Sequence, residues 1–145
     1  MHVVIFFTYD YSLKNWSDTG ILGRELIYYE KMLDENNDLQ ITFVTYGDKD
    51  DLDFSLNSKR IKVIPVYSII KKNKYRIVNL IKSFYIPFLL KNKIKVVDII
   101  KQYQLHGSWI SILFKYLVNK PLIVRTGYDM YEFSIRENKK FYKKF

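Results

Sequence analysis

Six residues that could take part in binding or catalysis follow, or end, apolar stretches that predict β-strands: Gly20, Gln104, His106, Arg125, Tyr128 and Asp129. A glycine at the start of a helix leaves backbone N–H groups open to an anion. Arg125 could serve as a fixed cation for a phosphate or carboxylate, and Asp129 could orient a bound group or pair with Arg125. If the strands are parallel, their carboxyl ends meet at one edge of the sheet, and we expect these residues to gather there.

Simpler roles stay open for several of these residues. Gly20 could be a loop-to-helix turn, His106 a loop residue with an ordinary pKa, and Arg125 a structural partner of Asp129. No residue is assigned as catalytic. The sequence has no cysteine and its two histidines are 104 positions apart, so we expect no metal site. The acidic cluster of residues 48–53 is predicted to be a solvated loop, because it lacks the central glycine and terminal glutamate of a calcium loop.

Five apolar runs predict the strands that would position these residues: 3–7, 41–46, 61–66, 96–100 and 122–126. The first run is unbroken, which is typical of a strand buried on both faces of a parallel sheet. The polar segment 9–19 is expected to be a loop that leads to a helix after Gly20, and residues 108–118 predict another helix. All five glycines are expected at or just beyond strand ends. We therefore predict one α/β domain over residues 1–145, a three-layer Rossmann-like parallel sheet of about five strands with flanking helices.

Residues 73–91 predict a helix that Pro87 kinks or divides. Its apolar side chains recur at three- and four-residue spacing and are Ile77, Leu80, Ile81, Phe84 and Phe88. We expect this stripe to cover the sheet. The surrounding basic residues also give the segment the composition of a helix that lies in a membrane interface, and they are Lys71, Lys72, Lys74, Arg76, Lys82, Lys91, Lys93 and Lys95.

The net charge of +9 is unevenly distributed along the chain. The first 58 residues carry 4 basic and 11 acidic residues, and the remainder carries 20 and 4. The basic part could be an ordinary lysine-rich surface or a face that meets anionic lipid headgroups. No nucleic-acid partner is expected. Because no apolar run reaches the roughly 20 residues of a membrane span, we expect a cytoplasmic protein that could be peripheral at the inner membrane face.

Four motifs, taken in order, resemble the amino-terminal domain of family-four glycosyltransferases, which have the two-domain GT-B architecture. They are WSDTGILGREL at 16–26, TYGD at 45–48, QLHG at 104–107 and KPLIVRTGYD at 120–129. The resemblance implies a retaining transferase that moves a sugar from a nucleotide-sugar donor to a glycan or lipid-linked acceptor. It places Gly20 near the donor diphosphate, and it implies no cofactor beyond the nucleotide sugar, which is a substrate.

The chain departs from the family's pattern in two respects. Tyr103 and Gln104 stand where many relatives have a histidine, and Gly127 and Tyr128 stand where many have a histidine and a glycine. The carboxyl-terminal donor-binding domain of the family is absent from these 145 residues, so we expect an acceptor-side half that is inactive alone.

Two other classes remain open. One is a non-catalytic basic module, derived from such a domain, that docks on membrane or protein. The other is a flavodoxin-like nucleotide or cofactor binder, against which the sequence has neither a P-loop nor the spaced glycines of a dinucleotide site.

Overall fold

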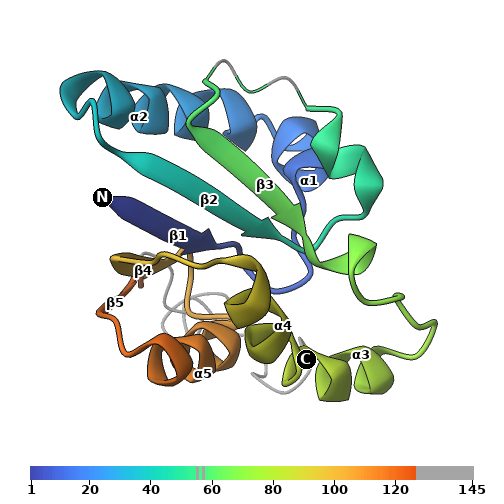
Figure 1. Cartoon of the computed structure of the whole chain (residues 1–145). Helices are drawn as coiled ribbons and strands as arrows, with labels where there is room; N and C mark the ends of the chain where they lie inside the picture. The colour runs from blue at the N-terminus through green and yellow to red at the C-terminus, as the bar shows by residue number, and fades with distance from the viewer. Residues whose placement is uncertain (55, 57, 127–145) are drawn as a thin grey trace, which may run out of the picture.

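A computed structural model of the chain describes residues 1–54, 56 and 58–126. Five strands form one all-parallel sheet in the order β3-β2-β1-β4-β5 (Figure 1), which confirms the predicted α/β fold class. In chain order the elements are β1 (His2–Phe6), α1 (Leu13–Asp18), α2 (Ile21–Glu35), β2 (Gln40–Thr45), η1 (Lys49–Leu52), β3 (Ile61–Pro65), η2 (Val66–Ser68), α3 (Arg76–Ser83), α4 (Ile86–Lys93), β4 (Ile99–Gln102), α5 (Ser108–Val118) and β5 (Leu122–Val124).

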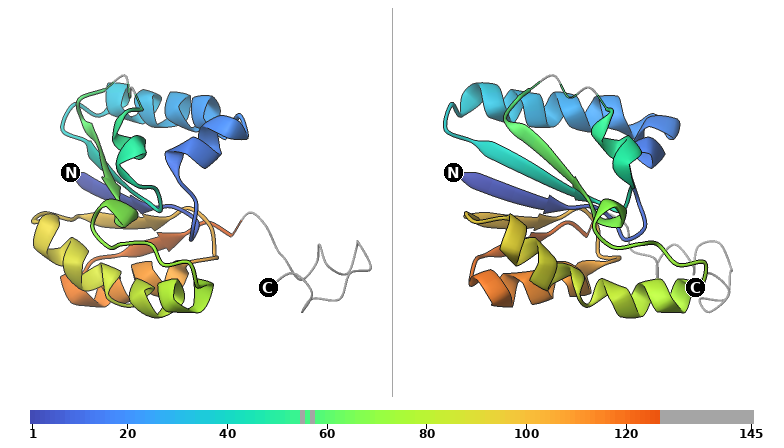
Figure 2. Two further views of the ribbon diagram at one scale, coloured as in Figure 1. Left: turned by 90° about the vertical axis from the view of Figure 1, so that its right-hand side faces the viewer. Right: turned by 45° about the vertical axis from the view of Figure 1, so that its right-hand side comes forward.

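The helices form one layer on each side of the sheet. Figure 2 shows α1 and α2 on one side and α3, α4 and α5 on the other. Strand β1 lies in the middle of the sheet, and its residues Val4, Ile5 and Phe6 are buried. A central strand with helices over both faces has no side that meets water, which explains the unbroken apolar run. Strands β1 and β2, which are joined through α2, are neighbouring parallel strands.

The segment 9–19 was expected to be a loop, and this prediction is wrong because the segment contains α1. The Ser12 hydroxyl accepts a hydrogen bond from the Asn15 backbone N–H, and the Asn15 side chain accepts one from the Ser12 N–H, which is a capping box. Leu13 and Trp16 are buried, and the Trp16 ring stacks on Phe7 with ring centroids 3.9 Å apart. This six-residue helix therefore closes the end of the core above β1.

Strand β4 is shifted from its expected position at 96–100. The Asp98 carboxylate accepts a hydrogen bond from the His2 N–H at 2.7 Å, and β1 pairs with the residues that follow, in the register Val3 to Ile99. The strand therefore includes Lys101 and the fully buried Gln102, whose amide donates to the Phe7 carbonyl. Lys101 Nζ donates to the Tyr29 hydroxyl at 3.3 Å, whereas the Gln102 amide oxygen has no partner among the described residues. Because two polar side chains lie in this strand, hydrophobicity alone located it too early in the chain.

The predicted helix over 73–91 is divided in two, as Pro87 suggested. Helix α3 ends at Ser83, and Pro87 is the second residue of α4. A proline is tolerated there because the first N–H groups of a helix have no partner within the helix.

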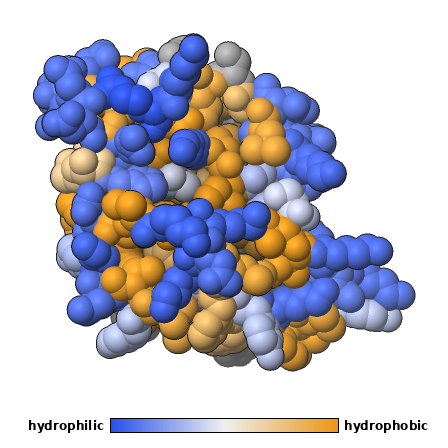
Figure 3. Space-filling view, in the orientation of Figure 1, coloured by the Kyte–Doolittle hydropathy of each residue, from blue (hydrophilic) through white to orange (hydrophobic). Residues whose placement is uncertain are grey.

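The prediction that the apolar stripe of this segment covers the sheet is wrong. The side chains that form it are exposed, namely Ile77 at 67%, Leu80 at 41%, Ile81 at 60%, Phe84 at 47% and Phe88 at 51%. Figure 3 shows apolar patches alternating with hydrophilic ones over the lower part of this view, where Figure 1 places α3 and α4. The residues of α3 that face inward are the polar Asn79 and Ser83.

Two glycines depart from the expected position at strand ends. Gly20 follows α1 rather than a strand, and Gly23 lies inside α2. Gly107, between β4 and α5, has a φ of +97°, and a Cβ there would lie 2.8 Å from the Cβ of Tyr9 and 2.9 Å from its backbone nitrogen. A side chain at Gly107 is therefore excluded both by the backbone conformation and by the close approach of Tyr9.

We predict that Gly107→Ala lowers the free energy of unfolding by about 2 kcal/mol or more, because it adds left-handed strain to a steric overlap. Gly23→Ala is expected to raise it by about 0.5–1 kcal/mol, because a Cβ at that helical position meets open space and restricts the unfolded chain. Urea unfolding of both variants measures the difference. Equal stability of the two would contradict the close contact between Gly107 and Tyr9.

Candidate functional site

The loops that follow the strands are joined by backbone hydrogen bonds at the carboxyl edge of the sheet. The Tyr9 N–H, after β1, donates to the His106 carbonyl, after β4, at 3.1 Å. The Tyr46 N–H donates to the Tyr11 carbonyl at 2.8 Å, and the Tyr67 N–H donates to the Gly47 carbonyl at 2.9 Å. Loops from four strands are thereby held in fixed positions relative to one another.

Aromatic side chains from these loops form a cluster. The Tyr9 ring lies 5.1 Å from Tyr46, 5.2 Å from Trp109 and 5.8 Å from His106, measured between ring centroids. All of these contacts are tilted or edge-on, which is the favoured geometry of aromatic pairs. The cluster forms a rigid aromatic wall at the edge where α/β sheets bind their ligands.

A charged group stands beside this cluster. The Asp10 carboxylate accepts hydrogen bonds from the Tyr67 hydroxyl at 3.1 Å and from Lys72 Nζ at 2.9 Å. The Lys72 ammonium also lies 4.6 Å from the centre of the Tyr67 ring. Asp10 has a φ of +66°, an unusual conformation for a residue other than glycine. Such strain is often retained at functional sites.

These residues border a groove of about 450 Å³. Besides Asp10, Tyr67 and Lys72, its lining includes Tyr46, Gly47 and residues of the acidic loop. Tyr46 is only 3% exposed, and its hydroxyl has no hydrogen-bond partner in the part of the chain that the structure describes. Among the described residues, the buried side-chain oxygens Glu30 Oε1, Thr45 Oγ1 and Gln102 Oε1 also lack a partner, so the Tyr46 hydroxyl is not unique in this respect.

The phenols at this groove remain protonated at physiological pH. Burial raises the pKa of Tyr46 well above 10, and the nearby Tyr9 and Tyr67 raise it further. Burial also raises the pKa of Tyr67, as does the charge of Asp10. Neutral phenols both donate and accept hydrogen bonds, so they can bind hydroxyl groups.

One acidic residue of this region is structural, contrary to the prediction of a solvated loop. Asp51 is buried, and its carboxylate accepts hydrogen bonds from the Leu13 N–H at 3.2 Å and the Lys14 N–H at 3.4 Å. It therefore caps the first turn of α1. Among the described residues, His, Asp and Glu side chains form no group of three or more that could hold a metal ion.

A second groove, of about 520 Å³, lies beside the exposed part of β3 and is lined by Lys62, Lys93 and Lys95. It is larger than the first, but it includes His2 and Gln40, which stand at the amino ends of β1 and β2. Because strand-end loops and a buried unpartnered hydroxyl meet only at the smaller groove of the two, that one is the candidate site.

Gly20 lies at the same end of the sheet but on the α2 side. It precedes the first residue of α2 with a φ of +71°, and no side chain caps the helix there. A Cβ at Gly20 would meet nothing within 4 Å. The amino terminus of a 15-residue helix is thus open, as an anion-binding role requires.

Arg125 has a partner that the sequence did not suggest. Its guanidinium lies 3.6 Å from the carboxylate of Glu25 on α2 and 5.2 Å from the centre of the Tyr103 ring. Glu25 is buried and also accepts a hydrogen bond from the Tyr103 hydroxyl at 2.9 Å. Half of the Arg125 side chain remains exposed. The pairing expected with Asp129 lies outside the described residues.

The structure thus places the sequence-predicted residues in two groups. His106 belongs to the aromatic cluster and Gln104 is half-buried in the same loop. Arg125 pairs with Glu25, in the second turn of the helix that Gly20 begins. Tyr128 and Asp129 lie outside the described residues. Sequence reasoning missed five residues of the region, although all but the last two directly follow β1, β2 or β3: Tyr9, Tyr46, Tyr67, Glu25 and Lys72.

His106 is exposed at the surface, yet its ring lies edge-on to both Tyr9 and Trp109. These rings keep water from part of the imidazole, and this desolvation lowers the pKa of His106 below the ordinary value of 6.5, while the negative charge of Asp10 acts in the opposite direction.

We predict that His106 titrates below 6.5 in the folded protein. Because the unfolded chain then binds its proton first, stability should fall as the pH drops below 6.5. Proton NMR resolves the signals of the two histidines, and His106→Gln assigns them. A midpoint above 6.5 would mean that Asp10 outweighs the desolvation.

Together these observations describe a Rossmann-like α/β domain with a groove, lined in part by Tyr46 and Tyr67, at the carboxyl edge of its sheet. Neither the protein-family models, nor the curated proteins, nor the solved structures contain a match to this chain. No helix among the described residues is long and apolar enough to cross a membrane.

Proposed function

We propose that these residues form the acceptor-side half of a retaining glycosyltransferase, which transfers a sugar from a nucleotide-sugar donor to a glycan or lipid-linked acceptor. The order of the motifs in the sequence and the Rossmann-like sheet both support this proposal. The observation that carries it is the groove at which a carboxylate, a phenol and an ammonium group meet, those of Asp10, Tyr67 and Lys72.

The chemistry of the groove suits a sugar. A sugar ring has apolar C–H faces and a rim of hydroxyl groups, so it requires flat aromatic surfaces together with hydrogen-bonding groups. Tyr67 provides aromatic surface and a hydroxyl group. The Asp10 carboxylate can accept hydrogen bonds from the hydroxyl groups of a sugar, and Lys72 can donate them.

The donor would approach from the α2 side. The open amino terminus of α2 at Gly20 could receive one end of a diphosphate through its free N–H groups and the positive end of the helix dipole. The resemblance implies that a second domain supplies the other contacts to the donor. Catalysis of transfer depends on charge stabilisation at the leaving diphosphate, so these residues alone would bind without turnover.

We predict that the protein binds simple glycosides at the groove. Saturation-transfer NMR with methyl glucoside, methyl galactoside and methyl mannoside should detect at least one of them. Removing a single hydroxyl group from the groove with Tyr67→Phe should weaken binding roughly fivefold. Tyr116→Phe is the matched control, because Tyr116 is 74% exposed on α5.

Asp10→Ala should abolish most of the saturation transfer, whereas Asp18→Ala, at an exposed position of α1, should leave it unchanged. No transfer to any of the three glycosides, or equal transfer with Asp10→Ala, would remove the support that the groove gives to the proposal.

We also predict that the 145-residue chain releases no nucleotide from common nucleotide sugars. A coupled assay for the released nucleoside diphosphate measures this. Turnover that Gly20→Trp abolishes would show that these residues form a complete enzyme rather than an acceptor-side half.

A second function, a non-catalytic docking module, is supported by the outward apolar stripe of α3 and α4. It differs from the first in requiring no sugar at the groove. The glycoside experiment therefore separates the two proposals.

A further inference from the structure

Helices α3 and α4, with the residues before and between them, expose eight large apolar side chains, which together we name the α3–α4 face. Its members are each between 37% and 67% exposed and are Tyr75, Ile77, Leu80, Ile81, Phe84, Tyr85, Phe88 and Leu89. An amphipathic helix of a globular domain normally turns such residues toward the core. Here eight of them lie within 15 consecutive residues on the outside.

The outward orientation of α3 is held by its polar side. The Asn79 side chain makes two hydrogen bonds with the backbone of Asn73, each 2.7 Å long. The Ser83 hydroxyl accepts a hydrogen bond from the Trp109 indole at 2.9 Å and donates to the Leu80 carbonyl. These bonds fix which side of the helix meets the protein, so the apolar side is left to the surroundings.

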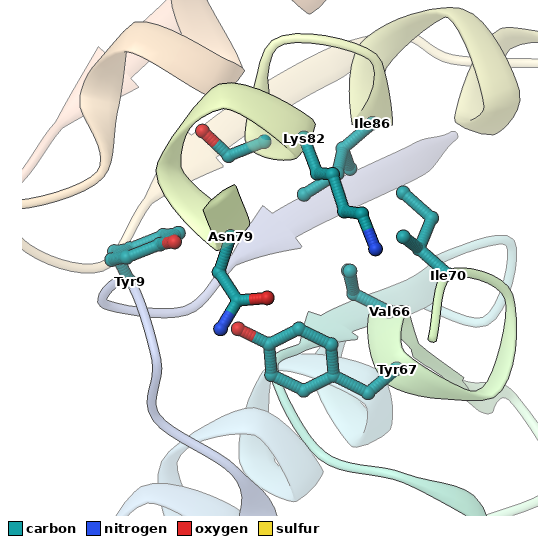
Figure 4. Close-up of a pocket in the computed structure, with 8 residues that line it drawn as sticks. Tyr9, Val66, Tyr67, Ile70, Asn79, Lys82 and Ile86 are labelled. Atoms are coloured by element: carbon teal, nitrogen blue, oxygen red, sulfur yellow. The ribbon is translucent and has the colours of Figure 1, made fainter. Parts of the chain in front are cut away.

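The space beneath α3 is nearly filled. Figure 4 shows Asn79, Lys82 and Tyr67 around a cavity between η2 and the two helices. Its volume is about 10 Å³, which is near the minimum that a single water needs. The apolar side chains of α3 therefore have no room to turn inward.

The charges around the α3–α4 face have one sign. Between Asp53 and Asp98 the chain has no acidic residue and 11 basic ones. Seven of those that flank the two helices are exposed: Lys71, Lys72, Lys74, Arg76, Lys91, Lys93 and Lys95. Only Lys72 has an acidic partner within the described residues, which is Asp10. The surface is thus an apolar stripe with a cationic border.

We propose that the α3–α4 face docks on an anionic lipid membrane, with its apolar side chains in the interface and its lysines among the headgroups. Aliphatic side chains are inserted together with tyrosines at the boundary, where aromatic residues with a polar end are favoured. Lysine stems can extend toward anionic headgroups while remaining beside the apolar region. This is the composition of a helix that lies in the membrane plane.

Other occupants fit less well. Nucleic acid would use the lysines, but exposed isoleucines and leucines contribute little to contacts with phosphates or bases. A second copy of the chain would bring the same cationic border against itself and be repelled. An acidic, apolar protein partner is the remaining alternative, and it predicts no binding to pure lipid.

Membrane docking would also restrict the chemical class of the acceptor, and this inference rests on the proposed function. Tyr67 and Lys72 border the groove and stand at the start of the segment that leads to α3. A protein held on the membrane by α3 would bring the groove close to the lipid surface. The acceptor would then be lipid-linked rather than a free glycan.

Vesicle sedimentation tests the docking without any sugar. Vesicles of phosphatidylcholine with 30% phosphatidylglycerol should bind the full chain, and pure phosphatidylcholine vesicles should bind it weakly. Raising salt from about 0.1 M to 0.5 M should reduce the binding, because the attraction between exposed charges is screened. Equal binding to both vesicles at both salt concentrations would overturn the role of the lysines.

Two matched pairs of variants test the face itself. Ile77→Ser with Ile81→Ser should weaken partitioning on the order of tenfold, because two apolar side chains no longer enter the interface. Ile27→Ser is the control, since Ile27 is 68% exposed on α2. Likewise, we expect weaker binding when Gln replaces Lys74, Lys91 and Lys93 together. Binding should not weaken when Gln replaces Lys31, Lys49 and Lys59.

Tryptophan fluorescence of the variant Phe84→Trp gives an independent measurement. Anionic vesicles should shift its emission to shorter wavelength, whereas they should not shift the emission of Ile27→Trp. Unchanged partitioning of the Ile77, Ile81 variant, or equal loss with Ile27→Ser, would overturn the proposal. Because no glycoside is present, a failure here leaves the groove proposal standing, and a failure of glycoside binding leaves the docking proposal standing.

Discussion

The contact between Gly107 and Tyr9 connects the loops at the point where the order of the strands reverses. In the order β3-β2-β1-β4-β5, strands β2 and β3 lie on one side of β1, and β4 and β5 lie on the other side of β1. Ligands of open α/β sheets bind above this point. The Tyr9 backbone can lie close to Gly107 because Gly107 has no side chain. The hydrogen bond from the Tyr9 N–H to the His106 carbonyl holds the two loops together. The Tyr9 ring packs against Tyr46 and Trp109, and Asp10 follows Tyr9 in the chain.

The order of the elements could be predicted from local patterns, because a buried parallel strand must be apolar throughout. This argument located β1 and β2 within one residue, and α5 is bounded by the residues predicted for it. It failed where polar residues are satisfied by partners distant in sequence. Gln102 is fully buried in β4 because its amide reaches the Phe7 carbonyl, 95 residues earlier, and no local pattern reports such a bond.

The residues of the candidate site could be predicted only in part, because contacts between residues distant in sequence bring some of them together. The rule that functional residues follow parallel strands identified the loop of Gln104 and His106. Tyr9, Tyr46 and Tyr67 also follow strands, but no local pattern distinguishes them from the other ten tyrosines of the chain. The pairing of Glu25 with Tyr103 and Arg125 joins a helix to the ends of two strands, and it emerges only from tertiary structure. For α3, the spacing of apolar residues showed that the helix is amphipathic. The hydrogen bonds of Asn79 and Ser83 decide which side faces the protein.

The acidic and basic parts of the sequence lie in different regions of the folded protein. Acidic residues from its first part stand around the groove, where Asp10, Asp48 and Asp50 form part of the lining. Basic residues from the later part border the α3–α4 face. An anionic membrane would attract the basic border and so orient the α3–α4 face toward the headgroups. The carboxylates disfavour anions within the groove itself. In the proposed transferase, the groove would therefore hold the neutral hydroxyl groups of the acceptor, while a diphosphate would be accommodated at the open end of α2, where no acidic residue stands in the first turn.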